Sequence, residues 1–597
     1  MLDKELKIVL DPKRDVVVDA CAGSGKTWLL ASRIVRLLLS DVNASEILAI
    51  TFTRKAAQEM KSRLIEWLRF LSVASDGEVR EFLIARGISR RDASQLESRA
   101  RSLYGEYLTS DPGININTFH GWFHQILQSA SWTSQSGRGY ELIEDETTIR
   151  TQAWDQYFAD VDAESVEYEV LSFLYFKFEL SNTHSILETH INSRLDWWSG
   201  SWDTQSDLFI RQWNELKTID PLSELRSTRF WNTFGEVKPL VERNGLKREL
   251  GLVNKIVETR EVDDLDACLV HLKSLFGKKR VPSTAMERRL GIEDQKRFLE
   301  LANHLSEMVL GAHDRYIKTV SAQLDCAVKI IGNQLISRYQ SLKRADKLLD
   351  FSDLEWNVKN LLTNETEAAH TLSRLDTRYS HILVDEFQDT NPIQWSVLKS
   401  WIKASDEAGG AVRLFFVGDP KQSIYRFRRA EPRLFDVAKK LVMSRPHGHN
   451  LNQSQSYRAT AALTGFINSC FTGAFEGFVE HRSTVGDLPT EVGLLGLVEK
   501  GASEHEENLR WRNPLVEPFL EVTDDRYFRE GLLIADKISE LVGGKYIREN
   551  GRDRPIAYSD ILILVRRRTH LGDYEDALKR RRIPYAGERK GFLLRKR

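Results

Sequence analysis

A glycine-rich loop between an apolar run and an amphipathic segment constrains the fold of this chain more than any other feature. Residues 16–19 read Val-Val-Val-Asp, residues 20–27 form the loop, and residues 28–40 carry apolar side chains at helical spacing. A β-branched run of this kind predicts a buried strand. Glycines let backbone N–H groups converge on phosphate oxygens, and the dipole of the following helix favours the same anions. The sequence therefore predicts an α/β fold in which a parallel sheet, flanked by helices, carries a phosphate-binding loop (P-loop).

We expect this loop to bind ATP. Its residues are Ala20, Cys21, Ala22, Gly23, Ser24, Gly25, Lys26 and Thr27. In such loops the lysine reaches the β- and γ-phosphates and the final hydroxyl binds Mg²⁺, which assigns these roles to Lys26 and Thr27. Ala20 stands where the common pattern has its first glycine. The alternative, a glycine-rich turn without a ligand, does not account for the flanking strand and helix.

Two further predicted strands end in polar side chains. Residues 382–384 form an apolar run before Asp385 and Glu386, and residues 413–417 precede Gln422. Ligands of open α/β sheets bind at the carboxyl ends of the strands, so we expect these side chains at one edge. Asp385 would hold Mg²⁺, Glu386 would polarise the attacking water, and Gln422 would sense the γ-phosphate or that water. Adjacent acids are also common in surface turns, and the assignment depends on the phosphate loop.

Tyr425 and Phe427 follow Gln422, with arginines at 426, 428 and 429. Aromatic rings among guanidinium groups can stack unpaired bases, each contributing about 1–3 kcal/mol. The alternative is that both rings are core residues, which is the more common arrangement for an isolated pair.

Composition limits the remaining possibilities. A chain of 597 residues is too long for one hydrophobic core, and 41% hydrophobic with 29% charged residues is typical of a globular protein. No apolar run approaches the about 20 residues of a membrane span, and the charged N-terminus lacks the apolar stretch of a secretory signal. We expect no membrane segment and a cytoplasmic protein. The 85 basic and 86 acidic residues nearly balance, so any DNA site must be local. The four cysteines have no paired spacing and predict neither a metal site nor a disulfide framework.

The order of these motifs resembles that of superfamily 1 DNA helicases of the UvrD and Rep type. Residues 22–27 and 421–428 are most similar to the AddA and RecB subunits of recombination helicase-nucleases, and residues 49–60, 116–121, 349–354 and 456–458 resemble further motifs in the same order. The resemblance implies an ATP-dependent DNA helicase or translocase in DNA repair and recombination, moving 3′ to 5′, with DNA-stimulated ATP hydrolysis.

The resemblance also implies residue roles and partners. In the family, Tyr457 packs on adenine and Arg458 reaches the γ-phosphate. The implied DNA contacts are Phe52, Thr53, Thr118, His120, Tyr425 and Phe427. The implied substrates are single-stranded DNA and single/double-strand junctions, and the implied protein partner is a second, AddB/RecC-like chain.

The implied architecture has three parts. Residues 1–128 and 345–445 would form a RecA-like motor domain 1A, residues 129–344 a large α-helical insertion 1B, and residues 446–597 a partial second RecA-like domain 2A. Within the insertion we expect Trp132, Trp154, Trp197 and Trp198 to be core residues rather than DNA contacts, because burial is the ordinary use of an aromatic ring.

The sequence departs from the family in several places. No glutamine that could read adenine occurs in residues 1–19, Ser456 replaces an asparagine, and Arg429 replaces a glycine. Residues 560–565 predict a strand and residues 574–582 a helix, after which the family's remaining motor motifs and the nuclease domain do not follow. We therefore expect a fragment, an interrupted gene product or a motor completed by a second polypeptide. A non-catalytic module that binds ATP and single-stranded DNA is the alternative function.

Overall fold

The computed structural model describes two compact units, Met1–Tyr457 and Arg458–Arg597. The described residues are 2–587, except for 130–138, 201–205, 245–246, 263, 279–280, 282–283, 364–367, 369–370, 374, 376–377, 410–411, 476, 487, 489, 500–523 and 550–551. Trp132 lies outside them. In the described part of the chain, no helix is both long and apolar enough to cross a bilayer.

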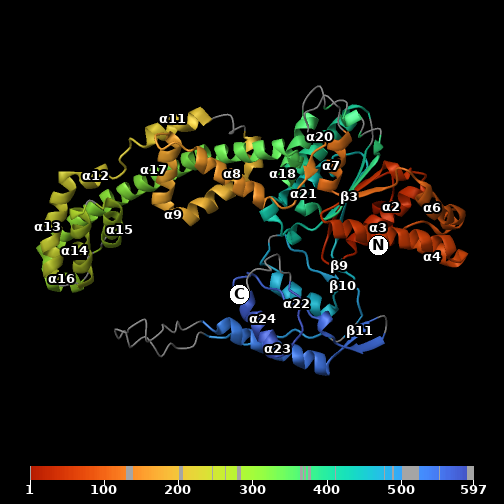
Figure 1. The fold of residues 1–597 in the computed structure, drawn as a ribbon. Helices are drawn as coiled ribbons and strands as arrows, with labels where there is room; N and C mark the ends of the chain where they lie inside the picture. The colour runs from red at the N-terminus through yellow and green to blue at the C-terminus, as the bar shows by residue number, and fades with distance from the viewer. Residues whose placement is uncertain are drawn as a thin grey trace. The chain divides into compact units, whose positions relative to one another are not determined.

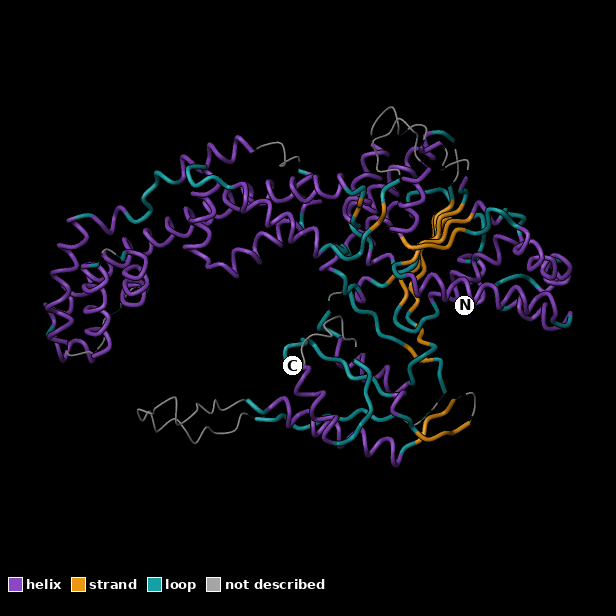
Figure 2. Tube along the Cα trace, in the orientation of Figure 1, coloured by secondary structure: helices purple, strands orange, loops and turns teal. Residues whose placement is uncertain are grey.

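A six-stranded parallel sheet organises the first unit (Figure 2). Its spatial order is β3-β2-β6-β7-β1-β8. The strands are β1 (Asp15–Ala20), β2 (Ile47–Thr51), β3 (Asn115–Thr118), β6 (His381–Val384), β7 (Arg413–Gly418) and β8 (Gly448–Gln453). The register aligns Val17 of β1 with Phe416 of β7 and with Asn450 of β8. The expected α/β fold with a parallel sheet is therefore confirmed. Strand β8 belongs to this sheet, and the first unit continues to Tyr457; the expected division into domains 1A, 1B and 2A stays a prediction.

Helices cover both faces of the sheet, because successive side chains of a strand point to opposite faces. Val16 and Val18 pack in one core with α2, α3, α4 and α6, whereas Val17 packs in the other with α7, α18, α20 and α21. These helices and their neighbours are α1 (Leu2–Val9), α2 (Lys26–Leu39), α3 (Arg54–Val73), α4 (Asp76–Ile84), α5 (Arg90–Gln95), α6 (Glu97–Thr109), α7 (Phe119–Ser129), α18 (Phe351–Thr363), α20 (Pro392–Glu407) and α21 (Arg433–Met443). The predicted strand, loop and helix around residues 16–40 are all present.

The interval between α7 and β5 (Leu348–Leu349) is helical, as its periodicity predicts. Its helices are α8 (Thr147–Asp160), α9 (Val166–Asn192), α10 (Arg194–Ser199), α11 (Ser206–Leu216), α12 (Ser223–Arg226), α13 (Thr228–Asn244), α14 (Lys247–Glu261), α15 (Leu265–Phe276), α16 (Thr284–Leu290) and α17 (Ile292–Ala345). Figure 1 shows α17 running along the whole segment, and its two halves contribute to separate cores. Trp154 is buried, but Trp197 and Trp198 are only half-buried.

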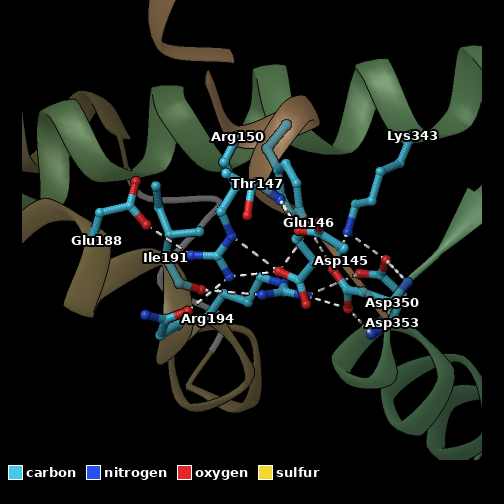
Figure 3. Close-up of polar contacts among 12 residues, drawn as sticks. Asp145, Glu146, Thr147, Arg150, Glu188, Ile191, Arg194, Lys343, Asp350 and Asp353 are labelled. Atoms are coloured by element: carbon cyan, nitrogen blue, oxygen red, sulfur yellow. Dashed lines mark hydrogen bonds and ion pairs between the residues drawn. The ribbon is translucent and has the colours of Figure 1, made fainter. Parts of the chain in front are cut away.

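A buried ion cluster lies where this helical segment meets the sheet (Figure 3). Lys343 of α17 donates to Asp350 at 2.6 Å and also to Asp353 of α18, and Arg194 of α10 pairs with Asp350. Next to it, β4 (Glu141–Leu142) pairs in parallel with β5. Charges this deeply buried need partners, so the four side chains fix α10, α17 and α18 relative to one another.

The second unit contains α22 (Ala461–Phe471), α23 (Arg526–Gly544), α24 (Leu571–Arg580), β10 (Arg482–Ser483), β11 (Tyr546–Glu549) and β12 (Arg552–Pro555). Helix α24 confirms the helix expected near residue 574. The prediction of a strand at residues 560–565 is wrong. Leu562 and Leu564 are 80% and 85% exposed, and no other described segment pairs with them. A buried strand needs paired neighbours, so the RecA-like character of this unit stays a prediction.

Candidate nucleotide site and nucleic-acid groove

The phosphate loop joins the end of β1 to the start of α2. Gly23 and Gly25 have φ angles of 73° and 85°, which L side chains rarely adopt, so both positions favour glycine. The hydroxyl of Ser24 is buried and finds no hydrogen-bond partner among the described residues. Backbone N–H groups at a helix N-terminus and an unsatisfied hydroxyl fit a phosphate ligand.

Lys26 and Glu386 meet at this loop. The Nζ of Lys26 lies 2.7 Å from Oε2 of Glu386, and the amide of Gln388 donates to the same oxygen at 2.8 Å. The Oε1 atom of Gln388 accepts from the backbone N–H of Asp419 at 2.9 Å. Glu386 itself has a left-handed backbone, with φ of 47°, which is uncommon for a residue other than glycine. The structure therefore brings the predicted lysine and glutamate together and adds Gln388, which sequence reasoning missed.

Asp385 is buried directly behind this pair. Burial, together with the neighbouring Glu386 charge, raises the pKa of Asp385 to about 7. Thr27 lies in the first turn of α2. In the described part of the chain, no three His, Cys, Asp or Glu side chains cluster as metal ligands. Mg²⁺ usually takes few protein ligands and completes its shell with phosphates and water, so a pair such as Thr27 and Asp385 fits it.

Gln422 lies after β7 on the same sheet edge, but its amide donates to Asp419 at 2.6 Å rather than to Glu386. Tyr457 is tied to the loop by its backbone N–H, which donates to the Gly23 carbonyl at 2.8 Å. Arg458 begins the second unit, and its predicted contact with the γ-phosphate stays a prediction.

A cavity of about 420 Å³ opens beside the phosphate loop. Ser24 and Gly25 form one side, and Trp28 and Tyr457 supply aromatic surface. Its polar side chains include Glu5 and Gln453. A nucleotide base next to bound phosphates would lie here. Neither Glu5 nor Gln453 belongs to a recognised motif, so the sequence held no signal for them.

A groove of about 940 Å³ contains most of the predicted DNA contacts. Its lining includes Phe52, Thr53, Thr118, His120 and Phe427. Tyr425, the sixth predicted residue, packs on Phe52 with ring centroids 4.3 Å apart and lies 5.7 Å from Phe427.

The three aromatic rings predicted to contact DNA, those of Phe52, Tyr425 and Phe427, are not buried core residues. Phe427 is 78% exposed, and the Arg428 guanidinium lies within 6 Å of the Phe52, Tyr425 and Phe427 rings. The two segments that carry these rings are far apart in sequence, but they follow β2 and β7 at one sheet edge. The arrangement can stack bases without reading their sequence.

Glu355 forms a buried polar centre at the floor of the groove. Its carboxylate lies 3.1 Å from Nε2 of His120 and accepts from the amides of Asn391 and Gln394 at 2.7–2.9 Å. Asn391 caps α20, which follows the Asp385–Glu386 segment. Glu355 adjoins the recognised segment 349–354, and this proximity was the only sequence signal for it.

Comparisons with known proteins give the family of this chain. The UvrD/REP helicase N-terminal domain matches residues 1–442. An ATP-dependent helicase/nuclease subunit of Listeria monocytogenes serotype 4b (strain F2365) is 25% identical over 99% of this chain and 49% of its own length. Proteins of the same name from Lactobacillus johnsonii and Geobacillus kaustophilus are 26% and 25% identical, over 94% and 98% of this chain and 47% and 49% of theirs. The chain spans about half the length of the curated relatives it matches.

Proposed function

The chain belongs to the UvrD/Rep helicase family, and we propose that it is an ATP-dependent DNA helicase of DNA repair and recombination that moves 3′ to 5′. One observation carries the proposal: the phosphate loop with its Lys26–Glu386 pair and the aromatic groove with Phe52 occupy the same carboxyl edge of one sheet. A nucleotide and a DNA strand would therefore contact the same few loops.

We propose that residues 20–27 bind the phosphates of ATP and that the cavity beside Tyr457 receives the base. Thr27 and Asp385 would hold Mg²⁺, which would supply charge neutralisation to the phosphates. Phosphates would compete with Glu386 for Lys26, and the freed carboxylate, still held by Gln388, would accept the proton of the attacking water. Gln422 would turn from Asp419 to that water or to the γ-phosphate. Arg458 would add positive charge at the γ-phosphate.

The groove would hold single-stranded DNA. Phe52, Tyr425 and Phe427 would stack bases, while Thr53, Thr118 and His120 would contact the backbone. Because the curated relatives are named as subunits of an ATP-dependent helicase/nuclease, we propose that an AddB/RecC-like second chain assembles with this one and that single/double-strand junctions are the substrate. We propose that the protein acts in the cytoplasm.

The test is ATP hydrolysis by the purified chain with and without single-stranded DNA. We expect DNA to stimulate ATP hydrolysis by the parent chain and not by Lys26→Ala. Phe52→Ala should need a higher DNA concentration for the same stimulation, and its rate without DNA should be unchanged. Equal turnover by the parent and Lys26→Ala proteins would instead support the non-catalytic binding module. Displacement of streptavidin from 3′- and 5′-biotinylated strands tests polarity, and faster release from the 5′ end is expected.

A further inference from the structure

A second hollow lies beside the groove, where the helical segment meets the sheet. Its volume is about 580 Å³, and the lining includes Trp197 and Trp198 of α10 and Trp356 of α18. The rings of Trp198 and Trp356 are 5.5 Å apart at 42°. All three tryptophans are half-buried; Trp197 and Trp198 also pack against the core of the helical segment, and Trp197 stacks on His190. We call these residues and their surroundings the tryptophan hollow.

The polar lining of the tryptophan hollow suits a nucleotide. Carboxamides of Asn333, Gln340 and Asn357 line it, and Arg344 adds an exposed cation. The ammonium of Lys359 lies 4.3 Å from the centre of the Trp356 ring. Aromatic faces, amides and cations together match bases and phosphates.

The charge at the floor of the hollow does not oppose a phosphate. Asp353 lines it, but this carboxylate pairs with the buried ammonium of Lys343. Its negative charge is thereby compensated within the protein. The rest of the polar lining is mainly amide and cationic.

The hollow and the groove are lined by different residues of the same two helices. Helix α10 gives Leu195 to the groove and Trp197 and Trp198 to the hollow. Helix α18 likewise gives Glu355 to the groove and Trp356 to the hollow. A strand bound in the groove would have to cross these two helices to reach the indoles.

We propose that the tryptophan hollow is a second subsite for single-stranded DNA, which takes about one or two further nucleotides of the strand held in the groove. The proposal rests on the proposed function, because the groove must hold the strand that continues into the hollow. Base stacking on Trp198 and Trp356 would extend the footprint without adding sequence preference. A helix of a partner protein is the competing occupant, and its chemistry would not require the carboxamides.

The first test measures the affinity of labelled oligonucleotides, from about 4 to about 16 nucleotides long, by fluorescence anisotropy. We expect Trp198→Ala and Trp356→Ala each to weaken binding of the long oligonucleotides about fivefold or more and to leave the shortest unchanged. Phe52→Ala should weaken binding at every length. Tryptophan variants that match the parent at every length would overturn the subsite and leave the groove intact. No effect of Phe52→Ala would instead count against the groove.

The second test uses the indoles as reporters and guards against misfolded alanine variants. A Trp198→Phe/Trp356→Phe double variant keeps stacking surface, so we expect nearly full affinity but a smaller quench of tryptophan emission on binding long DNA. Trp231→Phe, in the distal core of the helical segment, is the matched control and should keep the full DNA-dependent quench. An undiminished quench in the double variant would overturn the proposal.

Discussion

Gln388 positions the proposed catalytic residue Glu386. Because Gly418 has no side chain, it leaves the space that Gln388 occupies. A Cβ atom at Gly418 would lie 2.6 Å from Oε1 of Gln388 and 2.9 Å from the Phe435 ring. We predict that Gly418→Ala displaces Gln388 from Glu386 and lowers kcat of ATP hydrolysis about ten- to a hundredfold, with little change in KM. Steady-state kinetics measures both constants.

The matched control for Gly418→Ala is Gly105→Ala, because a Cβ there meets nothing within 4 Å. Gly105 lies inside α6, so alanine should leave kcat unchanged and stabilise the protein by about 0.5–1 kcal/mol. The prediction fails if Gly418→Ala hydrolyses ATP at the parent rate.

A separate prediction concerns Glu355 at the groove. Its buried carboxylate accepts hydrogen bonds from the amides of Asn391 and Gln394, and an amide at this position would point its own N–H₂ group at one of these donors. We predict that Glu355→Gln lowers the free energy of unfolding by about 1–3 kcal/mol and weakens DNA binding severalfold, because His120 loses its anchor. Urea unfolding and DNA anisotropy check the two effects. Glu144→Gln, an exposed carboxylate of the same groove, should not weaken DNA binding.

The contacts of Gln388 and Glu355 could not be predicted from the sequence, although functional roles for residues near them could. Lys26, Asp385 and Glu386 are recognisable because each follows an apolar strand, and parallel strands bring such ends to one edge. The partners of Glu355 depend on packing between segments 235 residues apart in sequence, as in its contact with His120. Local spacing carries no information on such a pair.

At the scale of elements, a buried ion cluster ties the C-terminal end of α17 to α18. Lys343 is 1% exposed and pairs with Asp350 and Asp353. We predict that Lys343→Met destabilises the first unit by about 3–5 kcal/mol in urea unfolding, because two buried carboxylates lose a shared cation. Lys318→Met removes an exposed ion pair with Asp314 on the same helix and should change stability by less than about 0.5 kcal/mol. Equal effects of the two variants would contradict the role assigned to the cluster.

The predicted helices and the predicted strands of the sheet are present, whereas the strand predicted at residues 560–565 is not. Helix α24 follows from periodicity within its own residues, and so do α2 and the helices of the 129–344 interval. The run Ile-Leu-Ile-Leu at 561–564 has strand composition, yet a strand forms only against a partner that supplies its hydrogen bonds. None of the described residues does so, and Leu562 and Leu564 stay exposed.

At the scale of the whole molecule, stability should depend on pH through groups buried far from each other. Burial lowers the pKa of His190 in the helical segment and of His381 in β6 from 6.5 to about 4. Each imidazole stays neutral in the folded state while the unfolded chain takes up a proton, so stability falls as pH drops from about 6.5 toward 4. Each histidine contributes at most about 3 kcal/mol to this loss.

Other buried groups also change protonation in this pH range. The pH dependence of each histidine variant is therefore compared with that of the parent protein. Asp385 and Asp389 have pKa values raised to about 7 and about 6 by burial, and they oppose the histidines because the folded state binds their protons more tightly. We predict that His190→Leu and His381→Val each flatten the fall in unfolding free energy between pH 6.5 and 4.5 relative to the parent, whatever the parent slope. Urea unfolding at stepped pH measures it. His447→Leu, on a loop before β8, is the control and should reproduce the slope of the parent protein. If the curve of His190→Leu runs parallel to that of the parent, burial of that imidazole contributes no pH dependence.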